Sequence, residues 1–355
     1  MSPKILLINL RHIGDSLLIT PLIANIKNSF PNAILDVLVN FECKSLFENN
    51  TNINKILAYN RAEYKKLGGI KRLIAELKFT LGVKNYDIVI ATTEGERSAF
   101  LSFLSGAKTR VGIRPPKGIF AKFIKPYTHE YTHKELLRHT VERNLDALRA
   151  INVQIVSKKV ELFFSKDDEN HINNLLPFDD FVHIHAVSRW AFKNLPPQTV
   201  ASVIDGLNLK VVLSGTEEDK AFNEEIIALC KTNKPLNLAG KLSLTQMAAL
   251  SKNAKLFFGI DSAPMHIAAS QGTPCVGVFG PSGVFNWGAW DNMIFECEYN
   301  SKNGVQHMGK NTMIQVNWDC APCGQAGCDN SRISNCLLDI KEEDILNACL
   351  AKLTI

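Results

Sequence analysis

The sequence predicts an α/β protein made of two domains, each built on a parallel β-sheet covered by helices. Its 355 residues are enough for two hydrophobic cores. Apolar runs typical of buried strands alternate with amphipathic segments in both halves, as expected of β-α-β units. A polar stretch with a proline, residues 166–180, is expected to be the linker. We therefore expect domains over residues 1–170 and 171–340, followed by a helical segment over 341–355.

Apolar stretches mark the strands of the first half, because strands of a parallel sheet are buried on both faces. Helices are marked by apolar residues at helical spacing, and Pro31 follows the end of the first one. The predicted strands are residues 5–9, 35–39, 88–91 and 160–164. The predicted helices are residues 17–30, 98–104 and 135–150.

The second half repeats this alternation. Its predicted strands are residues 181–186, 210–214 and 255–259. Its predicted helices are residues 200–207, 217–230, 244–250 and 342–352.

The segment from residue 259 to 282 carries the clearest sign of a ligand site. A predicted strand runs into Asp261-Ser262, and a helix then begins with Pro264 in its first turn. A second apolar strand follows Gly272 and ends at the Gly-Pro-Ser turn of residues 280–282. A helix N-terminus attracts phosphate, and open α/β sheets bind ligands where strand ends meet. By itself the segment indicates either a phosphate site or a purely structural β-α-β unit.

Charge is unevenly distributed along the chain. Residues 1–166 carry 26 Lys and Arg against 14 Asp and Glu, whereas residues 167–355 carry 14 against 21. The first half is therefore expected to meet an anionic partner, such as a phosphorylated lipid core or an anionic membrane surface. A merely solvated basic surface is the alternative. Few aromatic residues are interleaved with the basic ones, so nucleic acid is not expected as a partner.

The sequence predicts no membrane span, because it has no run of about 18 apolar residues. The N-terminal apolar run is interrupted by Asn9, Arg11 and His12, which favours a strand over a signal peptide. We expect a cytoplasmic protein.

Four motifs occur together in this chain. The opening K-I-L-L-I-N-L-R-H-I-G-D ends in Gly14-Asp15, and N-L-A-G at 237–240, D-S-x-P-M-H-x-A-A at 261–269 and F-G-P-S at 279–282 follow. In this combination the chain resembles the ADP-heptose:lipopolysaccharide heptosyltransferases, glycosyltransferase family 9. The resemblance implies two Rossmann-like domains facing a cleft, the glycosyltransferase B arrangement, with a final helix that returns to the first domain.

The resemblance also implies a reaction, in which L-glycero-D-manno-heptose moves with inversion from ADP-heptose to the lipopolysaccharide inner core. A base must take the proton of the acceptor hydroxyl, and positive charge must stabilise the departing diphosphate. The expected catalytic residues are Asp15 and Lys193. Position alone also allows Asp15 to be a helix cap. The S-R-x-x-x-K spacing at 188–193 most resembles the enzymes that add the third heptose.

The donor is expected to bind in the second domain, where Arg and Lys suit two adjacent phosphates. The expected donor-binding residues are Ser188, Arg189, Asp219, Leu238, Ala239, Gly240, Asp261, Ser262, Ala263 and His266. Helix capping is the alternative for Asp219, with Glu218 as a neighbouring candidate for the ribose, and packing within a helix is the alternative for His266. Relatives have a Trp soon after the Lys, whereas Asn194 follows here, so the pocket wall is expected to differ.

The acceptor is expected to bind in the first domain. The expected acceptor-binding residues are Arg11, His12, Gly14, Arg114 and Lys117. The expected partners are therefore an ADP-sugar, the lipopolysaccharide inner-core acceptor and an anionic membrane surface that a monomer contacts peripherally at the cytoplasmic face of the inner membrane.

Four cysteines cluster as C-x2-C-x4-C-x7-C at Cys320, Cys323, Cys328 and Cys336. A structural zinc site is one interpretation, and free or redox-active thiols are the other. No metal or other cofactor is expected in the chemistry, because relatives stabilise the diphosphate with protein groups.

Three alternative functions are compatible with an α/β fold of this kind. The nearest is another nucleotide-sugar glycosyltransferase of the same fold acting on a surface glycan. A nicotinamide oxidoreductase is disfavoured because the first strand is followed by L-R-H-I-G-D, without G-x-G-x-x-G. A silent binding protein is disfavoured because Asp15, Lys193 and Asp261 are all present.

Overall fold

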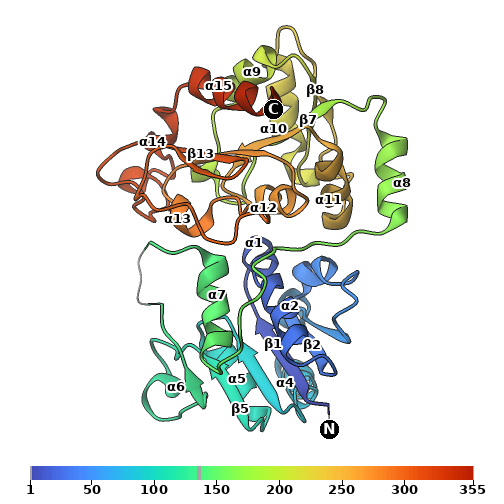
Figure 1. Ribbon diagram of the computed structural model, residues 1–355, viewed down its shortest axis with the longest axis vertical. Helices are drawn as coiled ribbons and strands as arrows, with labels where there is room; N and C mark the ends of the chain where they lie inside the picture. Colours follow the sequence, from blue (N-terminus) through green and yellow to red (C-terminus); the bar gives the residue numbers. More distant parts are fainter. Residues whose placement is uncertain (1, 134–136, 355) are drawn as a thin grey trace. The chain divides into compact units, whose positions relative to one another are not determined.

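The structure is a computed structural model that describes residues 2–133 and 137–354 (Figure 1). The chain divides into two compact units. Unit 1 comprises Met1–Leu136 and Thr140–Phe163, and unit 2 comprises Leu137–His139 and Phe164–Ile355. Each unit has one largely parallel sheet, which confirms the predicted α/β class.

The sheet of unit 1 has six parallel strands in the order β3-β2-β1-β4-β5-β6. The strands are β1 (Lys4–Asn9), β2 (Ile34–Asn40), β3 (Lys55–Tyr59), β4 (Ile88–Ala91), β5 (Thr109–Gly112) and β6 (His129–Glu130). β1 lies at the centre, and its residues 5–8 are fully buried. The strands predicted at 5–9, 35–39 and 88–91 are confirmed as β1, β2 and β4.

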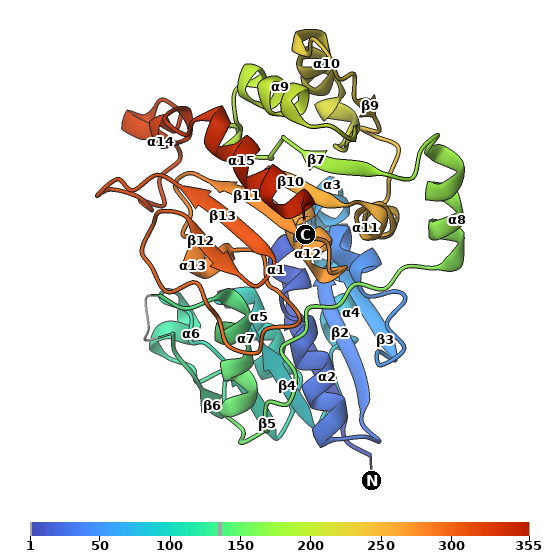
Figure 2. The same cartoon turned by 45° about the horizontal axis from the view of Figure 1, so that its top comes forward.

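Helices cover both faces of this sheet. The helices α2 (Thr20–Ser29) and α7 (Thr140–Arg149) pack together on one face (Figure 2). On the other face, α4 (Gly69–Leu81), α5 (Glu96–Leu104) and α6 (Ile119–Lys122) contribute to a single apolar cluster with β1, β2 and β4. The order of the strands explains this arrangement. The chain passes from β1 to β2 and β3 on one side of β1, and then to β4, β5 and β6 on the other side. Right-handed crossovers in these two directions place their helices on opposite faces of the sheet.

Two predicted helices of unit 1 are shorter than expected. The segment 17–30 is divided into α1 (Ile13–Leu17) and α2, because α2 begins at Thr20 with Pro21 in its first turn. The helix predicted at 135–150 is described from Thr140, and residues 134–136 lie outside the described part of the chain.

The strand predicted at 160–164 is wrong. Val160 and Leu162 are buried, so the alternation is real, but the segment joins no sheet. Its backbone is bound by side chains of α2 instead. The carboxamide oxygen of Asn25 accepts hydrogen bonds from the Val156 and Ser157 N–H groups, and Thr20 accepts one from Glu161 N–H.

The sheet of unit 2 has seven strands in the order β12-β13-β11-β10-β7-β8-β9, and only β12 is antiparallel. The strands are β7 (Phe181–His185), β8 (Lys210–Leu213), β9 (Leu236–Asn237), β10 (Leu256–Ile260), β11 (Cys275–Phe279), β12 (Gln306–Met308) and β13 (Asn311–Gln315). One face is covered by α9 (Pro197–Gly206), α10 (Lys220–Leu229) and α15 (Glu342–Leu353). The other face carries α8 (Lys166–Leu175) and α11 (Leu244–Asn253), and α11 packs against α12 (Ala263–Ser270).

The predicted linker at 166–180 is largely a helix. Ser165 and Asp168 form a capping box at the start of α8, and Ile172 is buried against the core of unit 2. The last helix, α15, packs against α9, β10 and β11 of unit 2. Its expected return to the N-terminal domain stays a prediction. Among the helices that the structure describes, none combines the length and the apolar character needed to cross a bilayer.

Candidate functional site

In unit 1, Asp15 lies just beyond the carboxyl end of the central strand β1. It belongs to the first turn of α1, whose N-cap residue, His12, makes no side-chain capping bond. The Asp15 carboxylate instead accepts a hydrogen bond of 3.0 Å from Arg11 Nε, and its side chain is 18% exposed. Asp15 is thus a solvent-accessible carboxylate beside a guanidinium. This arrangement does not match the capping alternative.

The loop that carries Asp15 is fixed by its neighbours. The Leu10 N–H donates to Thr93 Oγ1 at 2.9 Å, and Asn40 Nδ2 donates to the Arg11 carbonyl at 2.9 Å. Asn40 is the last residue of β2, and Thr93 lies just after β4. The carboxyl ends of three neighbouring strands therefore position Arg11 and Asp15 as one unit.

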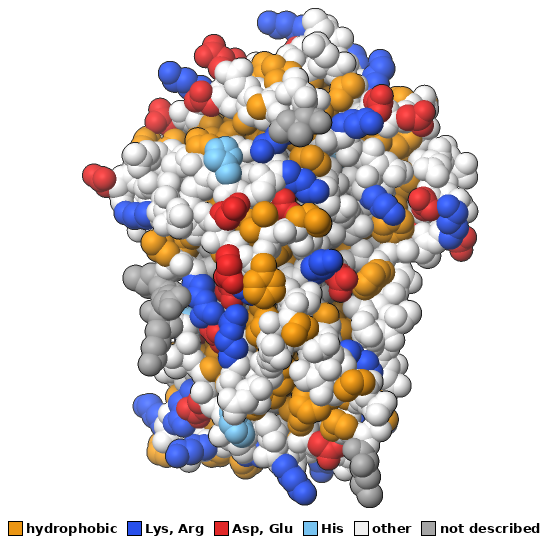
Figure 3. Space-filling view, viewed as in Figure 1, with side chains coloured by type: hydrophobic (Ala, Val, Ile, Leu, Met, Phe, Trp, Pro, Cys, Tyr) orange, Lys and Arg blue, Asp and Glu red, His pale blue; other side chains and the backbone are white. Residues whose placement is uncertain are grey.

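The other expected acceptor residues differ from Asp15 in their pairing and exposure. Arg114, at the end of β5, forms a bidentate pair with Glu130, with Nη2 2.7 Å from Oε1. Lys117 is exposed before α6, as is His12 before α1. On the face drawn in Figure 3, the Lys and Arg side chains of unit 1 are interspersed with Asp and Glu. That face therefore has no continuous patch of positive charge.

In unit 2, the structure brings together Lys193 and Asp261. Lys193 follows β7 and Asp261 follows β10, and these strands are neighbours in the sheet. Lys193 Nζ lies 2.5 Å from Asp261 Oδ2, with the two side chains 20% and 9% exposed. A half-buried ammonium at the carboxyl edge of a parallel sheet is well placed for an anionic ligand.

The loop between β7 and Lys193 is held by Asn194. Its carboxamide oxygen accepts a hydrogen bond of 2.8 Å from the Ser188 N–H. The Ser188 hydroxyl accepts one from Trp190 N–H, so its own proton can be donated to a ligand. Arg189 is exposed and lies over the Trp190 ring, with 5.8 Å between guanidinium and ring centre. The sequence suggested only that Asn194 alters the pocket wall. Its side chain also holds the loop between β7 and Lys193 in shape.

The segment after β10 folds as expected. Ser262 precedes α12, its hydroxyl donates to the Ile260 carbonyl, and it makes no side-chain capping bond. The first-turn N–H of Ala263 is at the same sheet edge as Lys193. His266 is buried within α12, in agreement with packing rather than catalysis.

Asp219 is positioned as a helix cap, which was the alternative to its expected contact with the ribose. Asp219 Oδ2 accepts hydrogen bonds from both the N–H and the hydroxyl of Thr216, so Asp219 caps a helical turn. Glu217 lies against Gly240, whose φ of +77° requires glycine, and a Cβ on Gly240 would collide with the Glu217 carboxylate. The carboxylate beside residues 238–240 is therefore Glu217, which the sequence reasoning missed. The sequence pointed to Asp219, with Glu218 as the neighbouring candidate, so Glu217 was not among the expected residues.

The backbone of residues 238–240 is already bonded on its donor side. The N–H groups of Leu238 and Gly240 donate to the carbonyls of Leu213 and Gly215, and the N–H of Ala239 donates to Asn237 Oδ1. What these three residues can offer a ligand is carbonyl oxygen, since each oxygen has two lone pairs.

Two buried histidines underlie this edge of the sheet. Ser214 Oγ lies 2.7 Å from His183 Nε2 and 3.0 Å from His185 Nδ1, while His183 Nδ1 lies 2.9 Å from Ser251 Oγ. Burial lowers the pKa of His183 to about 3 and that of His185 to about 4. Both rings are neutral at pH 7 and serve as hydrogen-bonding supports.

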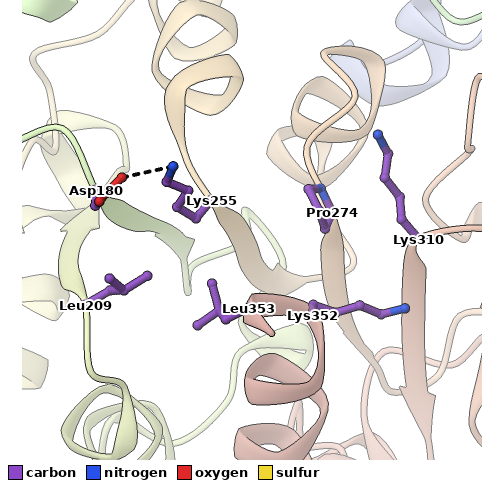
Figure 4. A pocket seen from close by; sticks show the side chains of 7 residues that line it. All are labelled: Asp180, Leu209, Lys255, Pro274, Lys310, Lys352 and Leu353. Atoms are coloured by element: carbon purple, nitrogen blue, oxygen red, sulfur yellow. Dashed lines mark ion pairs between the residues drawn. The ribbon is translucent and has the colours of Figure 1, made fainter. Parts of the chain in front are cut away.

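A pocket of about 470 Å³ lies elsewhere in unit 2 (Figure 4). Its lining includes Asp180, Leu209, Lys255 and Lys310, each of which directly precedes a strand. The pocket is thus at the amino edge of the sheet, opposite the edge that carries Lys193 and Asp261. Lys255 is paired there with Asp180 at 3.0 Å.

The four clustered cysteines lie in a segment with little regular structure. All four are free thiols, and Cys336 alone is buried. Burial raises the pKa of Cys336 to about 11, and the other three thiols add to the rise. Across residues 2–133 and 137–354, however, no three His, Cys, Asp or Glu side chains are arranged to hold a metal ion.

The chain is similar to known transferases over most of its length. The family model described as glycosyltransferase family 9 (heptosyltransferase) matches residues 74–313. The lipopolysaccharide heptosyltransferase 3 of Escherichia coli K12 is 30% identical over 81% of this chain and 85% of its own length. The lipopolysaccharide core heptosyltransferase OpsX of Haemophilus influenzae is 23% identical over 87% and 88%.

Solved structures support the same fold. A glycosyltransferase family 9 protein from Veillonella parvula superimposes with a TM-score of 0.81 at 21% identity, covering 99% of this chain and 98% of its own. The E. coli heptosyltransferase WaaC, solved with ADP, gives 0.73 at 15% identity, over 98% and 99%. These matches confirm the glycosyltransferase B fold. With the sequence matches over most of the chain, they place this protein in glycosyltransferase family 9, the heptosyltransferases.

Proposed function

We propose that this heptosyltransferase moves L-glycero-D-manno-heptose from ADP-heptose to the inner core of lipopolysaccharide, as the third heptose of that core. The observation that carries the proposal is the 30% identity to a lipopolysaccharide heptosyltransferase 3 over most of both chains. The S-R-x-x-x-K spacing that ends at Lys193 supports the same choice.

In the proposed reaction the acceptor hydroxyl attacks the anomeric carbon of the heptose. The bond from that carbon to the phosphate oxygen breaks, ADP leaves, and Asp15 takes the hydroxyl proton. The site geometry supports Asp15 as the base, because its carboxylate is accessible and does not cap a helix. Arg11 at 3.0 Å positions the carboxylate.

The departing diphosphate needs positive charge and hydrogen-bond donors. We assign these to Lys193, Arg189, the Ser188 hydroxyl and the N-terminus of α12. In this proposal Asp261 keeps Lys193 in place and accepts hydroxyl groups of the sugar. Glu217 replaces Asp219 as the carboxylate for the ribose, because Asp219 is engaged as a cap.

The Asp15 assignment is tested with Asp15→Asn. Acceptor-dependent ADP release should fall by about 10²–10⁴-fold, because the proton then has no base to receive it. ADP affinity should stay unchanged, since Asp15 belongs to unit 1. The control is Glu48→Gln, which removes an exposed carboxylate of unit 1 that pairs with Lys44. Undiminished turnover in Asp15→Asn would overturn the assignment.

We also propose that the enzyme acts as a monomer in peripheral contact with the cytoplasmic face of the inner membrane, where its acceptor is anchored. The basic excess of residues 1–166 supports a contact with anionic lipid.

The zinc interpretation of Cys320, Cys323, Cys328 and Cys336 stays a proposal. It is supported by the compact C-x2-C-x4-C-x7-C spacing of these residues. Metal analysis of the purified chain should find one zinc per molecule, and a Cys323→Ser, Cys328→Ser variant should have none. Metal-free wild-type protein with four reactive thiols would contradict it.

A further inference from the structure

The helix α4 of unit 1 has its apolar side turned outward. Its five large aliphatic residues share one helix face by their spacing and are 47–75% exposed. They are Ile70, Leu73, Ile74, Leu77 and Leu81. We refer to them as the α4 stripe.

The inward side of α4 is partly polar. Glu76 accepts a hydrogen bond from the Tyr59 hydroxyl and forms an ion pair with Arg97 of α5, with Arg97 Nη1 2.8 Å from Oε2. Phe79 packs edge-on against Tyr59. A surface helix of a soluble domain normally presents the reverse pattern. The outward stripe is therefore a feature that the core of unit 1 does not explain.

A second group of exposed apolar residues lies on the neighbouring helices. Phe100 and Phe103 of α5 are about 40% exposed, at 43% and 42%, and both rings contact Phe120 of α6. Ile119 and Phe123, around α6, are 52% and 82% exposed. Phe79, Phe120 and the buried side of α5 belong to one cluster, so all three helices form one layer over the sheet. Figure 1 shows the ribbons of α4, α5 and α6, which carry these exposed residues.

Basic side chains accompany both groups. Residues 61–81 contain six Lys and Arg but only two acids, and one of these, Glu76, is engaged by Arg97. Residues 117–125 contain Lys117, Lys122 and Lys125 and no acid. An apolar surface flanked by lysine and carrying aromatic residues is typical of proteins that lie on anionic bilayers. A second copy of the chain is a poorer occupant, because lysine would then face lysine.

We propose that the outer surface of α4, α5 and α6 is the membrane-docking surface of this protein, with anionic phospholipid as its partner. The layer is suitably placed for this role. Crossover helices run antiparallel to the strands, so α4, α5 and α6 begin at the carboxyl edge of the sheet, where Asp15 lies. Docking would hold that edge near the lipid surface. That position would give Asp15 access to a membrane-anchored acceptor. This consequence rests on the proposed function, whereas the binding to lipid does not.

Vesicle binding tests the surface without any substrate. The full chain should co-sediment with vesicles of phosphatidylethanolamine and phosphatidylglycerol, and not with pure phosphatidylcholine. Binding should weaken as NaCl is raised from about 50 to about 500 mM, because salt screens the lysine contribution. The double variant Leu73→Gln, Leu77→Gln should bind at least about tenfold more weakly, because it loses two inserted apolar side chains.

The matched control is Met293→Gln, Leu338→Gln, which changes two residues of unit 2 that are 82% and 55% exposed. It should bind vesicles as the wild type does. All these positions are on the surface, so thermal unfolding should be unchanged. Wild-type protein that fails to bind anionic vesicles, or a stripe variant that binds them normally, would overturn the proposal. A stripe variant that instead abolishes self-association would assign the surface to a second copy and also overturn it.

Turnover separates this proposal from the proposed function. With a deacylated, water-soluble core oligosaccharide as acceptor, the stripe variant should release ADP at the wild-type rate. With lipopolysaccharide in anionic vesicles it should be slower. Absence of turnover in every protein would reject the proposed function while leaving the vesicle-binding result intact.

Discussion

The ion pair of Lys193 and Asp261 is expected to affect both the stability of the protein and its turnover. Asp261 is 8% exposed, and the ammonium of Lys193 lies 2.5 Å from its carboxylate. In Lys193→Met the carboxylate loses that partner, and the free energy of unfolding should fall by about 2 kcal/mol. Chemical denaturation measures this loss.

The double variant Lys193→Met, Asp261→Asn separates the two roles. It removes the unpaired charge, so it should recover part of the stability without recovering turnover. Wild-type turnover in either variant would contradict the assignment of Lys193 to the departing diphosphate.

The buried histidines predict how stability depends on pH. Their pKa values lie near 3 and 4 in the folded protein, below the ordinary value of 6.5. Between about pH 4 and pH 6.5 these histidines are protonated in the unfolded chain but neutral in the folded chain. The free energy of unfolding therefore falls as the pH is lowered through 6.5. Each histidine should cost about 1.4 kcal/mol per pH unit once the pH is well below 6.5.

Urea unfolding between pH 7.5 and pH 5 measures this dependence. His185→Asn should lower the slope by up to one proton, whereas His171→Asn, on the exposed side of α8, should leave it unchanged. An identical slope in His185→Asn and the wild type would contradict the neutral assignment.

At the scale of elements, the side chain of Asn25 in α2 makes the backbone hydrogen bonds of residues 156–157 that a neighbouring strand would make in a sheet. Its side chain accepts two backbone N–H groups and donates to the carbonyls of Pro21 and Ser157. Asn25→Ala leaves these buried groups unpaired and should cost about 3 kcal/mol of stability. Asn28→Ala, at an exposed position of the same helix, should be nearly neutral. Equal effects in a thermal melt would contradict this role.

This element also shows the limit of prediction from the pattern. Continuous apolar runs predicted β1, β2 and β4, because only a strand buried on both faces needs them. The alternation of Val160 and Leu162 fits a strand equally well, but it carries no information on what binds the backbone. Here the partners are side chains of a helix distant in sequence.

The start of α8 also shows what the sequence could and could not predict. The spacing Ser165-x-x-Asp168 is typical of a helix start. The segment is nevertheless predicted to be a linker, because the residues of α8 are mostly polar. For the candidate site, sequence placed Asp15, Lys193 and Asp261 at strand ends. It could not distinguish Glu217 from Asp219, because the choice depends on which carboxylate faces Gly240.

At the scale of the whole molecule, the fold tolerates extensive sequence change. Two solved relatives, at 21% and 15% identity, superimpose with TM-scores of 0.81 and 0.73. The apolar pattern of the strands is enough to specify the two sheets, whereas the polar residues at the strand ends decide the chemistry.

Nucleotide selectivity is a property of unit 2 as a whole. If residues 238–240 face the base of the donor, as we propose, their carbonyl oxygens can accept hydrogen bonds from the amino group of adenine but not from the O4 carbonyl of uracil. ADP should therefore raise the melting temperature of the protein clearly, and UDP at the same concentration much less. Equal shifts would contradict a site built for ADP.

The central claim, that this enzyme adds the third heptose from ADP-heptose, is tested most directly by ADP release with a series of lipopolysaccharide cores. The cores should carry no, one or two heptoses and be compared at equal concentration. We predict release with the core that carries two heptoses, its loss in Asp15→Asn, and little release with the others. Turnover on a core without heptose, or none on any core despite tight ADP binding, would contradict the claim.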